Sequence, residues 1–431
     1  MEEYKHTRRS RIETLPPPKT VSIPLSQHIG APCTALVQVG DSVTMGQKIG
    51  DVAGGLGCPV HASVSGVVKA IEKKMTPSGN VTENIVIEND MRNTPCPDMK
   101  PFPKPLTEAT ADEIIAVVRE AGISGMGGAA FPTYAKISSA IGKVDKIIVN
   151  CAECEPFITA NHRLLLENPA SVINGVKILL KTLGVRCAYI AVEDNKMDAI
   201  AKLEELCAGS KMISVKVMKT KYPQGDERQL IYALTGMEIP QGKLPADVGC
   251  VIFNAETCSA IFRAFAQGMP LIKRIVTVDG DCVKKPRNLL VPIGTSVSDL
   301  ITYCGGLTRT PNKLISGGPM MGQAQWDFEM PVIKSTSAIL LLSERFNNGK
   351  GTGGASTCIR CGKCVQNCPM HLMPMYIAQF SKINDMESAE QYGAMSCVEC
   401  GSCSYNCPGG VEIVQHIRVA KAAIRLKNQK K

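Results

Sequence analysis

Two runs of cysteines near the C-terminus have the residue type and the spacing of metal ligands. Each run reads C-x2-C-x2-C-x3-C-P, and together they contain eight of the nineteen cysteines of the chain. Four thiolates can hold a cubane [4Fe-4S] cluster, and in a doubled run of this spacing the fourth cysteine ligates the other cluster. We therefore predict two clusters. The first has the ligands Cys358, Cys361, Cys364 and Cys407, and the second has Cys368, Cys397, Cys400 and Cys403.

Zinc is the alternative occupant of such thiols. Zinc sites usually contain two separated CxxC pairs rather than a repeated run of four cysteines, so the pattern favours iron–sulfur clusters. Two neighbouring clusters would let an electron pass from one to the other. The segment between the runs, residues 371–395, predicts one or two short helices.

Glycines are concentrated in a second stretch, GISGMGGAAFPTYAKI, which contains Gly122, Gly125, Gly127 and Gly128. Glycine lets backbone N–H groups approach an anion closely, and the N-terminus of a following helix favours negative charge. The stretch is therefore a candidate phosphate cradle. A tight structural turn explains the same glycines equally well.

Acids and amides follow several of the expected strands. The apolar run KIIVN leads into Glu153 and Glu155, and later strands are followed by Glu193, Asn254 and Glu256. Ligands of open α/β sheets bind at the carboxyl ends of the strands, where such groups suit sugar hydroxyls or ring nitrogens. The same residues could equally be helix N-caps.

The composition favours a multidomain protein in a reducing compartment. The chain has 431 residues, too many for one compact core, and is too long for a secreted disulfide scaffold. Its polar start, MEEYKHTRRSR, lacks the apolar stretch of a secretory signal, and an apolar run such as residues 338–342 is too short to span a membrane. We therefore expect a cytoplasmic location.

The net charge of +9 is moderate and is partly concentrated in the last residues. This basic end suggests the solvated face of a final helix, or else a docking surface for an acidic partner or an anionic membrane. Nucleic acid is not expected as a partner, because the basic residues lack interleaved aromatics and the chain has one Trp. The basic residues are Arg418, Lys421, Arg425, Lys427, Lys430 and Lys431.

The pattern of strands, helices and breakers changes along the chain and predicts its domains. Short β-type runs broken by glycine predict a small β domain, in which we expect His28 and His61 to be structural. Strands that alternate with helices predict an α/β domain with a mainly parallel sheet. The predicted parts are an N-terminal extension (1–20), the β domain (21–90), a proline-rich linker (91–108), the α/β domain (109–270), a small α+β unit (271–325), a connector (326–357) and the cluster domain (358–431).

The order of the motifs resembles the C subunit of Rnf electron-transport complexes. The resemblance rests on QHIGAP, GMGGAAFPTYAK, NCAECEPFITANHR, KYPQGDERQL, FNAETCSAI, ISGGPMMG and the two cysteine runs. The central region is also similar to the NADH- and FMN-binding subunit of respiratory complex I. The resemblance implies a multidomain α+β fold. Its parts are an N-terminal β barrel-sandwich hybrid, a Rossmann-like FMN/NADH domain, a β-grasp SLBB unit and a helical dicluster ferredoxin domain.

The resemblance also implies an activity. Electrons would pass between NAD(H) and two [4Fe-4S] clusters through FMN, in a translocase-coupled ferredoxin:NAD+ oxidoreductase with other Rnf subunits as partners and ferredoxin as an indirect one. The protein would then be peripheral to the cell membrane on its cytoplasmic side. No side chain is expected to act as a nucleophile or a general base, because the residues position and tune the cofactors. The implied FMN and NADH contacts are Gly125, Gly127, Gly128, Ala129, Phe131, Lys136, Asn150, Glu153, Glu155, Glu193, Asn254, Glu256 and Thr257.

Two departures from the family pattern leave alternatives open. Ala152 replaces the aspartate of the complex I element, which is compatible with a cluster scaffold that has lost its flavin. The N-terminus lacks the F-x-G-G-x-H-P stretch common in Rnf C subunits, which is compatible with a related carrier that serves a soluble reductase such as proline reductase.

Overall fold

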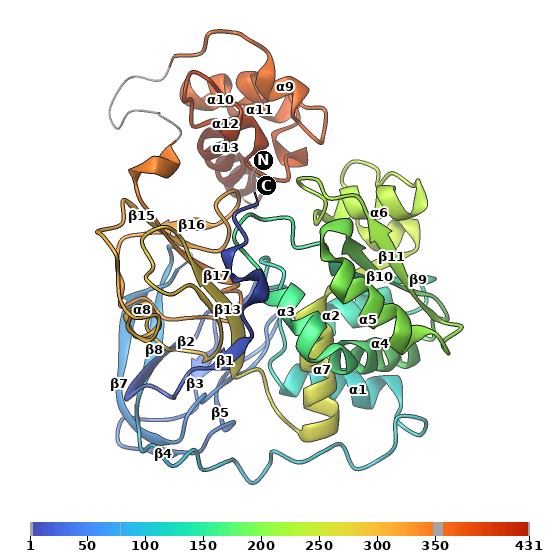
Figure 1. The fold of residues 1–431 in the computed structure, drawn as a ribbon, viewed down its shortest axis with the longest axis vertical. Coiled ribbons are helices and arrows are strands. Elements are labelled where there is room, and N and C mark those ends of the chain that lie inside the picture. Colours follow the sequence, from blue (N-terminus) through green and yellow to red (C-terminus); the bar gives the residue numbers. More distant parts are fainter. Residues whose placement is uncertain (1–2, 78, 348–356, 430–431) are drawn as a thin grey trace. The chain divides into compact units, whose positions relative to one another are not determined.

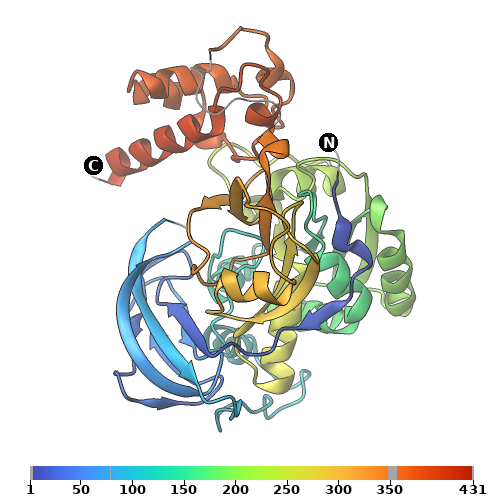
Figure 2. The same ribbon diagram turned by 60° about the vertical axis from the view of Figure 1, so that its left-hand side comes forward.

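The computed structural model describes residues 3–77, 79–347 and 357–429, which form two compact units. The larger unit contains most of residues 3–342. The smaller unit contains residues 357–429 with 343–347 and the short segments Pro240–Lys243 and Pro319–Gly322. Residues 348–356 of the predicted connector lie outside the described residues. Most helices and strands of each unit are labelled in Figure 1, and Figure 2 shows the same ribbon turned by 60°.

The first domain of the larger unit, after residues 3–14, is a β-sandwich of two antiparallel sheets, drawn in blue in Figure 1. Alternate residues such as Val21, Ile23, Ile85 and Ile87 are fully buried in one core, as the period-2 pattern of a half-buried strand requires. The first sheet has the order β2 (Thr20–Pro24), β8 (Val81–Asn89), β7 (Gly66–Met75) and β4 (Ser42–Val43), and the second has β3 (Thr34–Ala35), β5 (Lys48–Asp51) and β6 (Val60–His61).

An α/β domain follows, with a parallel sheet of four strands in the order β11 (Ile213–Met218), β10 (Ala188–Glu193), β9 (Lys146–Cys151) and β12 (Cys250–Asn254). Ile147, Ile148 and Val149 are completely buried, because helices cover both faces of such a sheet. The helices are α1 (Ala111–Glu120), α2 (Thr133–Ala140), α3 (Ala160–Glu167), α4 (Pro169–Leu183), α5 (Met197–Cys207), α6 (Glu227–Thr235) and α7 (Ala255–Gln267), with the 3-10 turns η2 (Asp194–Lys196) and η3 (Pro245–Val248).

Local signals explain where these helices begin and how they pack. Thr110 and Glu113 form a capping box at the start of α1, each side chain accepting the other's backbone N–H. Helices α4 and α7 come very close at Gly175, where a Cβ atom would lie 1.9 Å from the carbonyl oxygen of Cys258. Only glycine permits that contact.

The third part of the larger unit is a six-stranded mixed sheet, and it is larger than the predicted α+β unit at 271–325. Its order is β1 (Ile12–Thr14), β14 (Arg287–Pro292), β13 (Lys273–Asp279), β17 (Ala338–Leu342), β15 (Lys313–Ser316) and β16 (Gln323–Gln325), with helix α8 (Val297–Tyr303).

Two strands of this sheet come from segments that the sequence predicts to be an N-terminal extension and a connector. Strand β17 lies inside the predicted connector, yet it is an inner strand whose five residues are all buried. Strand β1 lies in the predicted N-terminal extension and pairs in parallel with β14. The sheet therefore takes one strand from the predicted extension and one from the predicted connector, because both strands pair with partners outside those segments, which local periodicity does not reveal.

The smaller unit is helical. Its helices are α9 (Lys363–Gln366), α10 (Pro374–Lys382), α11 (Met386–Gln391), α12 (Ser402–Tyr405) and α13 (Ile413–Gln429), so two helices follow each other between the cysteine runs. Ile377, Ala378, Ile417 and Ala420 are buried where α10 packs on α13. The 3-10 turns of the chain outside the α/β domain are η1 (His6–Arg9), η4 (Glu344–Asn347) and η5 (Ala394–Ser396). Within the described ranges, no helix is both long and apolar enough to cross a lipid bilayer.

Candidate cofactor sites

The order of the parallel sheet predicts where the α/β domain binds a ligand. The chain runs outward from β9 to β10 and β11, and then returns to place β12 on the other side of β9. Ligands of such sheets bind at the carboxyl ends of the strands at this reversal. Asn254 is the last residue of β12 and Asn150 is the second-last residue of β9, and the two are register partners, so both lie at the reversal.

The glycine-rich loop between α1 and α2 lies at this point. A Cβ atom on Gly127 would be 3.6 Å from Cβ of Asn254, and a Cβ atom on Gly128, whose φ is +115°, would have nothing within 4 Å. The N–H of Gly125 donates to the carbonyl of Phe131 across the loop at 2.8 Å. The loop is therefore folded on itself, and at Gly127 and Gly128 its backbone has room for a close approach.

Two side chains from beyond the loop hold it in place. Thr257, buried in α7, accepts the backbone N–H of Met126 at 3.1 Å. The guanidinium of Arg274 lies 3.5 Å from the carbonyl oxygen of Met126, and it forms a buried ion pair with Glu256 at 3.0 Å. Glu256 also accepts a hydrogen bond from the backbone N–H of Ile275, so its buried carboxylate has partners within the protein. The resemblance implies a flavin contact for Glu256, and the structure gives its carboxylate these partners within the protein.

Of the remaining predicted contact residues near β12, Lys136 and Asn254 bind other parts of the protein, and Ala129 and Phe131 are at least partly exposed. Lys136 donates to Glu227 at 3.0 Å and to the carbonyl of Ile252 in β12 at 3.2 Å. Asn254 caps α7 by accepting the N–H of Glu256. Ala129 is exposed and Phe131 is half-buried, at the end of the loop that leads into α2.

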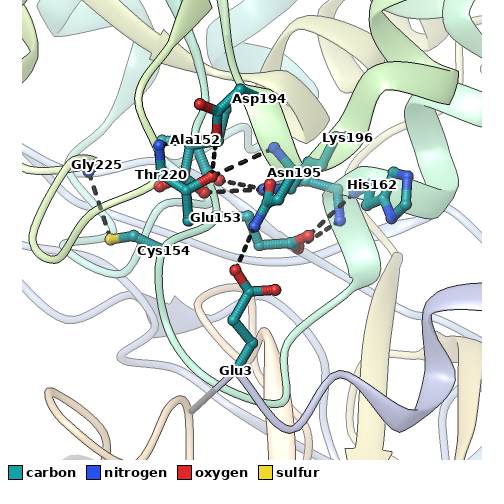
Figure 3. A network of polar contacts seen from close by, with 12 residues as sticks. Glu3, Ala152, Glu153, Cys154, His162, Asp194, Asn195, Lys196, Thr220 and Gly225 are labelled. Atoms are coloured by element: carbon teal, nitrogen blue, oxygen red, sulfur yellow. Dashed lines mark hydrogen bonds and ion pairs between the residues drawn. The ribbon is translucent and has the colours of Figure 1, made fainter. Parts of the chain in front are cut away.

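At the end of β9, a group of hydrogen bonds joins residues 150–154 to the segment that contains Gly225. The side-chain amide of Asn150 donates to the carbonyl of Gly225 and accepts the N–H of Ala152. The thiol of Cys154 accepts the N–H of Gly225 at 3.4 Å, as Figure 3 shows. Ala152 takes part through its backbone alone, so the loss of an acidic side chain there leaves this group intact.

The two glutamates that follow β9 also have partners in the protein. The carboxylate of Glu153 accepts the backbone N–H groups of Asn161 and His162 at the start of α3, which is the helix-capping role left open by the sequence. The carboxylate of Glu155 lies against Gly318, where a Cβ atom would come within 2.2 Å of it.

Glu193, at the end of β10, has one carboxylate oxygen left over. Its Oε2 accepts from the ammonium of Lys196 at 2.9 Å, and both side chains are almost completely buried. Lys196 also donates to the carbonyl of Ala152 at 2.7 Å (Figure 3). Burial raises the pKa of Glu193, while Lys196 opposes the shift. Its Oε1 is buried without a hydrogen-bond partner, and such an atom is costly unless a ligand or water satisfies it.

Lys196 and Arg274 were missed by the sequence analysis. Arg274 stands beside Lys273 at the start of the strand KRIVTVD, where nothing in the sequence distinguishes the two cations, whereas Lys196 could have been noticed as a cation three residues beyond a strand-end acid.

In the smaller unit the cysteines gather around two cavities. The first has a volume of about 350 Å³, and its lining contains Cys358, Cys361, Cys364 and Cys407. Two of its described lining residues are cations, Arg360 and Lys382, and none is an acid. The second is about 20 Å³, and its lining contains Cys368, Cys397, Cys400 and Cys403. The structure thus brings together the same two sets of four that the spacing predicted.

Basic residues of the last helix support the second set. Lys421 donates to the carbonyl of Cys397 at 2.7 Å and pairs with Glu399, which also binds Arg418 at 3.0 Å. Burial raises the pKa of Cys397 to about 11 and that of Cys403 to about 12, so both thiols stay protonated at neutral pH until a cation binds. Two residues of the basic end therefore face inward, while Arg425 and Lys427 are exposed.

The donor sets fit the groups that the family resemblance implies. Two sets of four thiols match two cubane clusters in number and chemistry. Among the described residues, no three His, Cys, Asp or Glu side chains are close enough to hold one metal ion between them. In the α/β domain, an open glycine backbone and an unsatisfied buried carboxylate oxygen meet the needs of a phosphate-bearing cofactor with polar ring atoms.

Comparison with known families gives four matches along the chain. They are the RnfC barrel-sandwich hybrid domain (residues 1–92), the Nuo51 FMN-binding domain (118–263), the SLBB domain (275–324) and a 4Fe-4S dicluster domain (353–408). Among solved structures, an NAD+-reducing [NiFe]-hydrogenase chain matches with a TM-score of 0.50 and 18% identity, covering 76% of this chain and 64% of that one. That likeness concerns the fold alone.

Curated relatives match over almost the whole chain. The C subunit of the Na(+)-translocating ferredoxin:NAD(+) oxidoreductase complex of Acetobacterium woodii is 45% identical, with 96% of this chain and 93% of that protein covered. The C subunit of the proton-translocating complex of Clostridium ljungdahlii is 44% identical, with 98% and 92% covered. The predicted family and fold class are confirmed: the chain belongs to the family of C subunits of Rnf-type ferredoxin:NAD(+) oxidoreductase complexes.

Proposed function

We propose that this protein passes electrons between NAD(H) and two iron–sulfur clusters through FMN, as the NADH-side subunit of a ferredoxin:NAD+ oxidoreductase. One observation carries the proposal. A flavin-type α/β domain, with its glycine loop at the strand reversal, shares one chain with two sets of four cysteines around two cavities. NADH delivers electrons in pairs and a cubane cluster takes one at a time, and FMN converts between the two.

The residues of the α/β domain would bind and orient the cofactor. The open backbone at Gly127 and Gly128 suits a phosphate, with Thr257 and Arg274 holding the loop that presents it. The free oxygen of Glu193 would accept a hydrogen bond from the flavin or from the nicotinamide amide. Asn150 and Asn254, register partners near the carboxyl ends of β9 and β12, would border the same site. In this assignment Glu153 and Glu155 shape the site through their loop.

In the smaller unit, Cys358, Cys361, Cys364 and Cys407 would ligate one [4Fe-4S] cluster, and Cys368, Cys397, Cys400 and Cys403 the other. The division of the eight thiols between two cavities supports this assignment. The partners would be other subunits of the complex, through which electrons from ferredoxin arrive, and the protein would sit at the cytoplasmic side of the membrane. The relatives are C subunits of ion-translocating complexes, which supports this context.

The test is an anaerobic reconstitution of the full chain with iron, sulfide and FMN. We expect two clusters and one FMN per chain, reduction of the clusters by NADH seen by EPR, and NADH-dependent reduction of ferricyanide. Protein that holds both clusters but neither binds FMN nor oxidises NADH would contradict the proposal and favour a cluster scaffold without flavin.

A further inference from the structure

The N-terminal segment, residues 3–14, is built into the α/β domain and the six-stranded sheet of the larger unit. The carbonyl of Glu3 accepts the N–H of Phe157 at 2.9 Å, and the ring of Tyr4 stacks on the ring of Phe157 at 5.2 Å between centroids. The carboxylate of Glu3 accepts from the side chain of Asn195 at 2.8 Å, as seen at the centre of Figure 3. The segment therefore crosses the loop that follows β9.

Lys5 is the central contact of this segment. Its ammonium donates to the backbone carbonyls of Glu153 at 3.0 Å, Glu155 at 3.1 Å and Ile158 at 2.6 Å. An ammonium has three donors, so all three are directed at one loop. Burial lowers the pKa of Lys5, and the nearby carboxylate of Glu153 opposes that shift. A cation so enclosed is kept only where its hydrogen bonds are good.

The loop needs such support, because its backbone is unusual. Glu153 and Phe157 have φ values of +49° and +69°, in the left-handed region that non-glycine residues rarely adopt. Such conformations persist where surrounding contacts hold them, and they are concentrated at functional sites. The loop carries Glu153, Cys154 and Glu155, and its first residue, Ala152, is held at its carbonyl by Lys196. Lys5 and Lys196 thus fix the loop from two sides.

The segment that presents Lys5 is itself anchored to the sheet. The next residues bind in turn: His6 pairs with Asp279 of β13 at 3.0 Å, and the hydroxyl of Thr7 lies 2.6 Å from that of Thr159. Strand β1 then pairs with β14. The position of the Lys5 ammonium is therefore set by the six-stranded sheet.

We propose that Lys5 is a positioning residue of the flavin-type site. It holds the 152–158 loop in the conformation that shapes the pocket for FMN and NADH at the end of β9. The proposal rests on the proposed function, and it assigns the first residues of the chain to the α/β site rather than to the β-sandwich that follows them in sequence. Lys5 acts through the loop.

The test is Lys5→Met in the full chain reconstituted with FMN and both clusters. We expect FMN affinity, measured by fluorescence quenching, to fall by about tenfold, and KM for NADH to rise more than kcat falls, because a small displacement at a binding site costs affinity first. Iron content and the EPR signals of the clusters should stay as in the wild type. Lys19→Met is the matched control, since Lys19 is an exposed lysine and should change none of these values.

Lys5→Arg keeps the charge and guards against a variant that fails to fold. A planar guanidinium cannot direct three donors from one atom, so we expect an intermediate loss of FMN affinity. Folded variants that bind FMN and NADH as the wild type does, or that lose only thermal stability, would overturn the proposal. A wild-type protein that binds no FMN would instead refute the proposed function, so the two failures are distinguishable.

Discussion

The two candidate cofactor regions differ in how many of their polar side chains have hydrogen-bond or ion-pair partners within the protein. In the α/β domain, Glu153 caps a helix, Glu256 binds Arg274, and Glu193 binds Lys196 with one oxygen. In the smaller unit, the thiols line two cavities, and burial keeps Cys397 and Cys403 protonated. The polar side chains of the first region thus have partners within the protein. In the second region a metal ion would take the place of the thiol protons, since thiols bind metals as thiolates.

The largest effect that this difference predicts is the selective loss of one cluster. Cys407→Ala removes a thiol from the cavity lined by Cys358, Cys361 and Cys364, so we expect about half of the iron to be lost together with one EPR signal. Cys368→Ala should remove the other signal, because Cys368 lines the second cavity. The measurements are iron content and EPR of the reduced protein.

The control for both variants is Cys207→Ala, a buried cysteine in α5 of the larger unit. It should keep the full iron content. If Cys407→Ala removed the cluster of the second run instead, each run would hold its own cluster, and the crossed arrangement would be wrong.

The next largest effect is on the stability of the larger unit, through its buried ion pair between Arg274 and Glu256. Arg274→Met leaves the buried carboxylate of Glu256 without its cation, which costs about 3–5 kcal/mol of unfolding free energy. Denaturant unfolding followed by circular dichroism should show this loss in the larger unit, with unchanged iron content. Adding Glu256→Gln should restore part of the stability, because the uncompensated charge is then removed. A double variant no more stable than Arg274→Met would show that the ion pair is not the source of the effect.

These contrasts also explain what the sequence could predict. The cysteine runs encode their grouping in local spacing, and the strands of the parallel sheet are continuous apolar segments, so both were visible in the sequence. The role of Glu153 was not visible, because a carboxylate after a strand can either cap a helix or contact a ligand. Only the folded structure distinguishes these two roles. Strand β17 and Lys5 were missed since their partners lie far away in sequence.

A third prediction concerns pH and the β-sandwich that leads into the glycine loop. His61 is completely buried next to Gly122 and Lys334, and burial, followed by Lys334, lowers its pKa to about 3. The unfolded chain binds a proton there below about pH 6.5 and the folded chain does not, so stability falls as the pH falls. Between pH 7 and pH 5 this amounts to about 2 kcal/mol.

His61→Leu should therefore flatten the pH dependence of the melting temperature of the larger unit, measured by circular dichroism at pH 5, 6 and 7. If wild type and variant lost stability in parallel over that range, His61 would not be the group responsible. The acid sensitivity would then belong to other groups of the larger unit, such as His28, whose pKa is also lowered by burial.

The smallest expected effect tests whether the hydrogen bond between Thr257 and the glycine loop contributes to cofactor binding. Thr257→Val keeps the shape of the side chain but removes the acceptor for the N–H of Met126 in the glycine loop, which costs about 1 kcal/mol. Thr182→Val is the control, because its buried hydroxyl donates to a carbonyl within helix α4 and touches no part of the loop. If both variants lose similar stability but only Thr257→Val weakens FMN binding by a few fold, the hydrogen bond matters because it holds the loop at the strand reversal. Equal FMN affinity in the two variants would mean that the loop keeps its position without the hydrogen bond to Thr257.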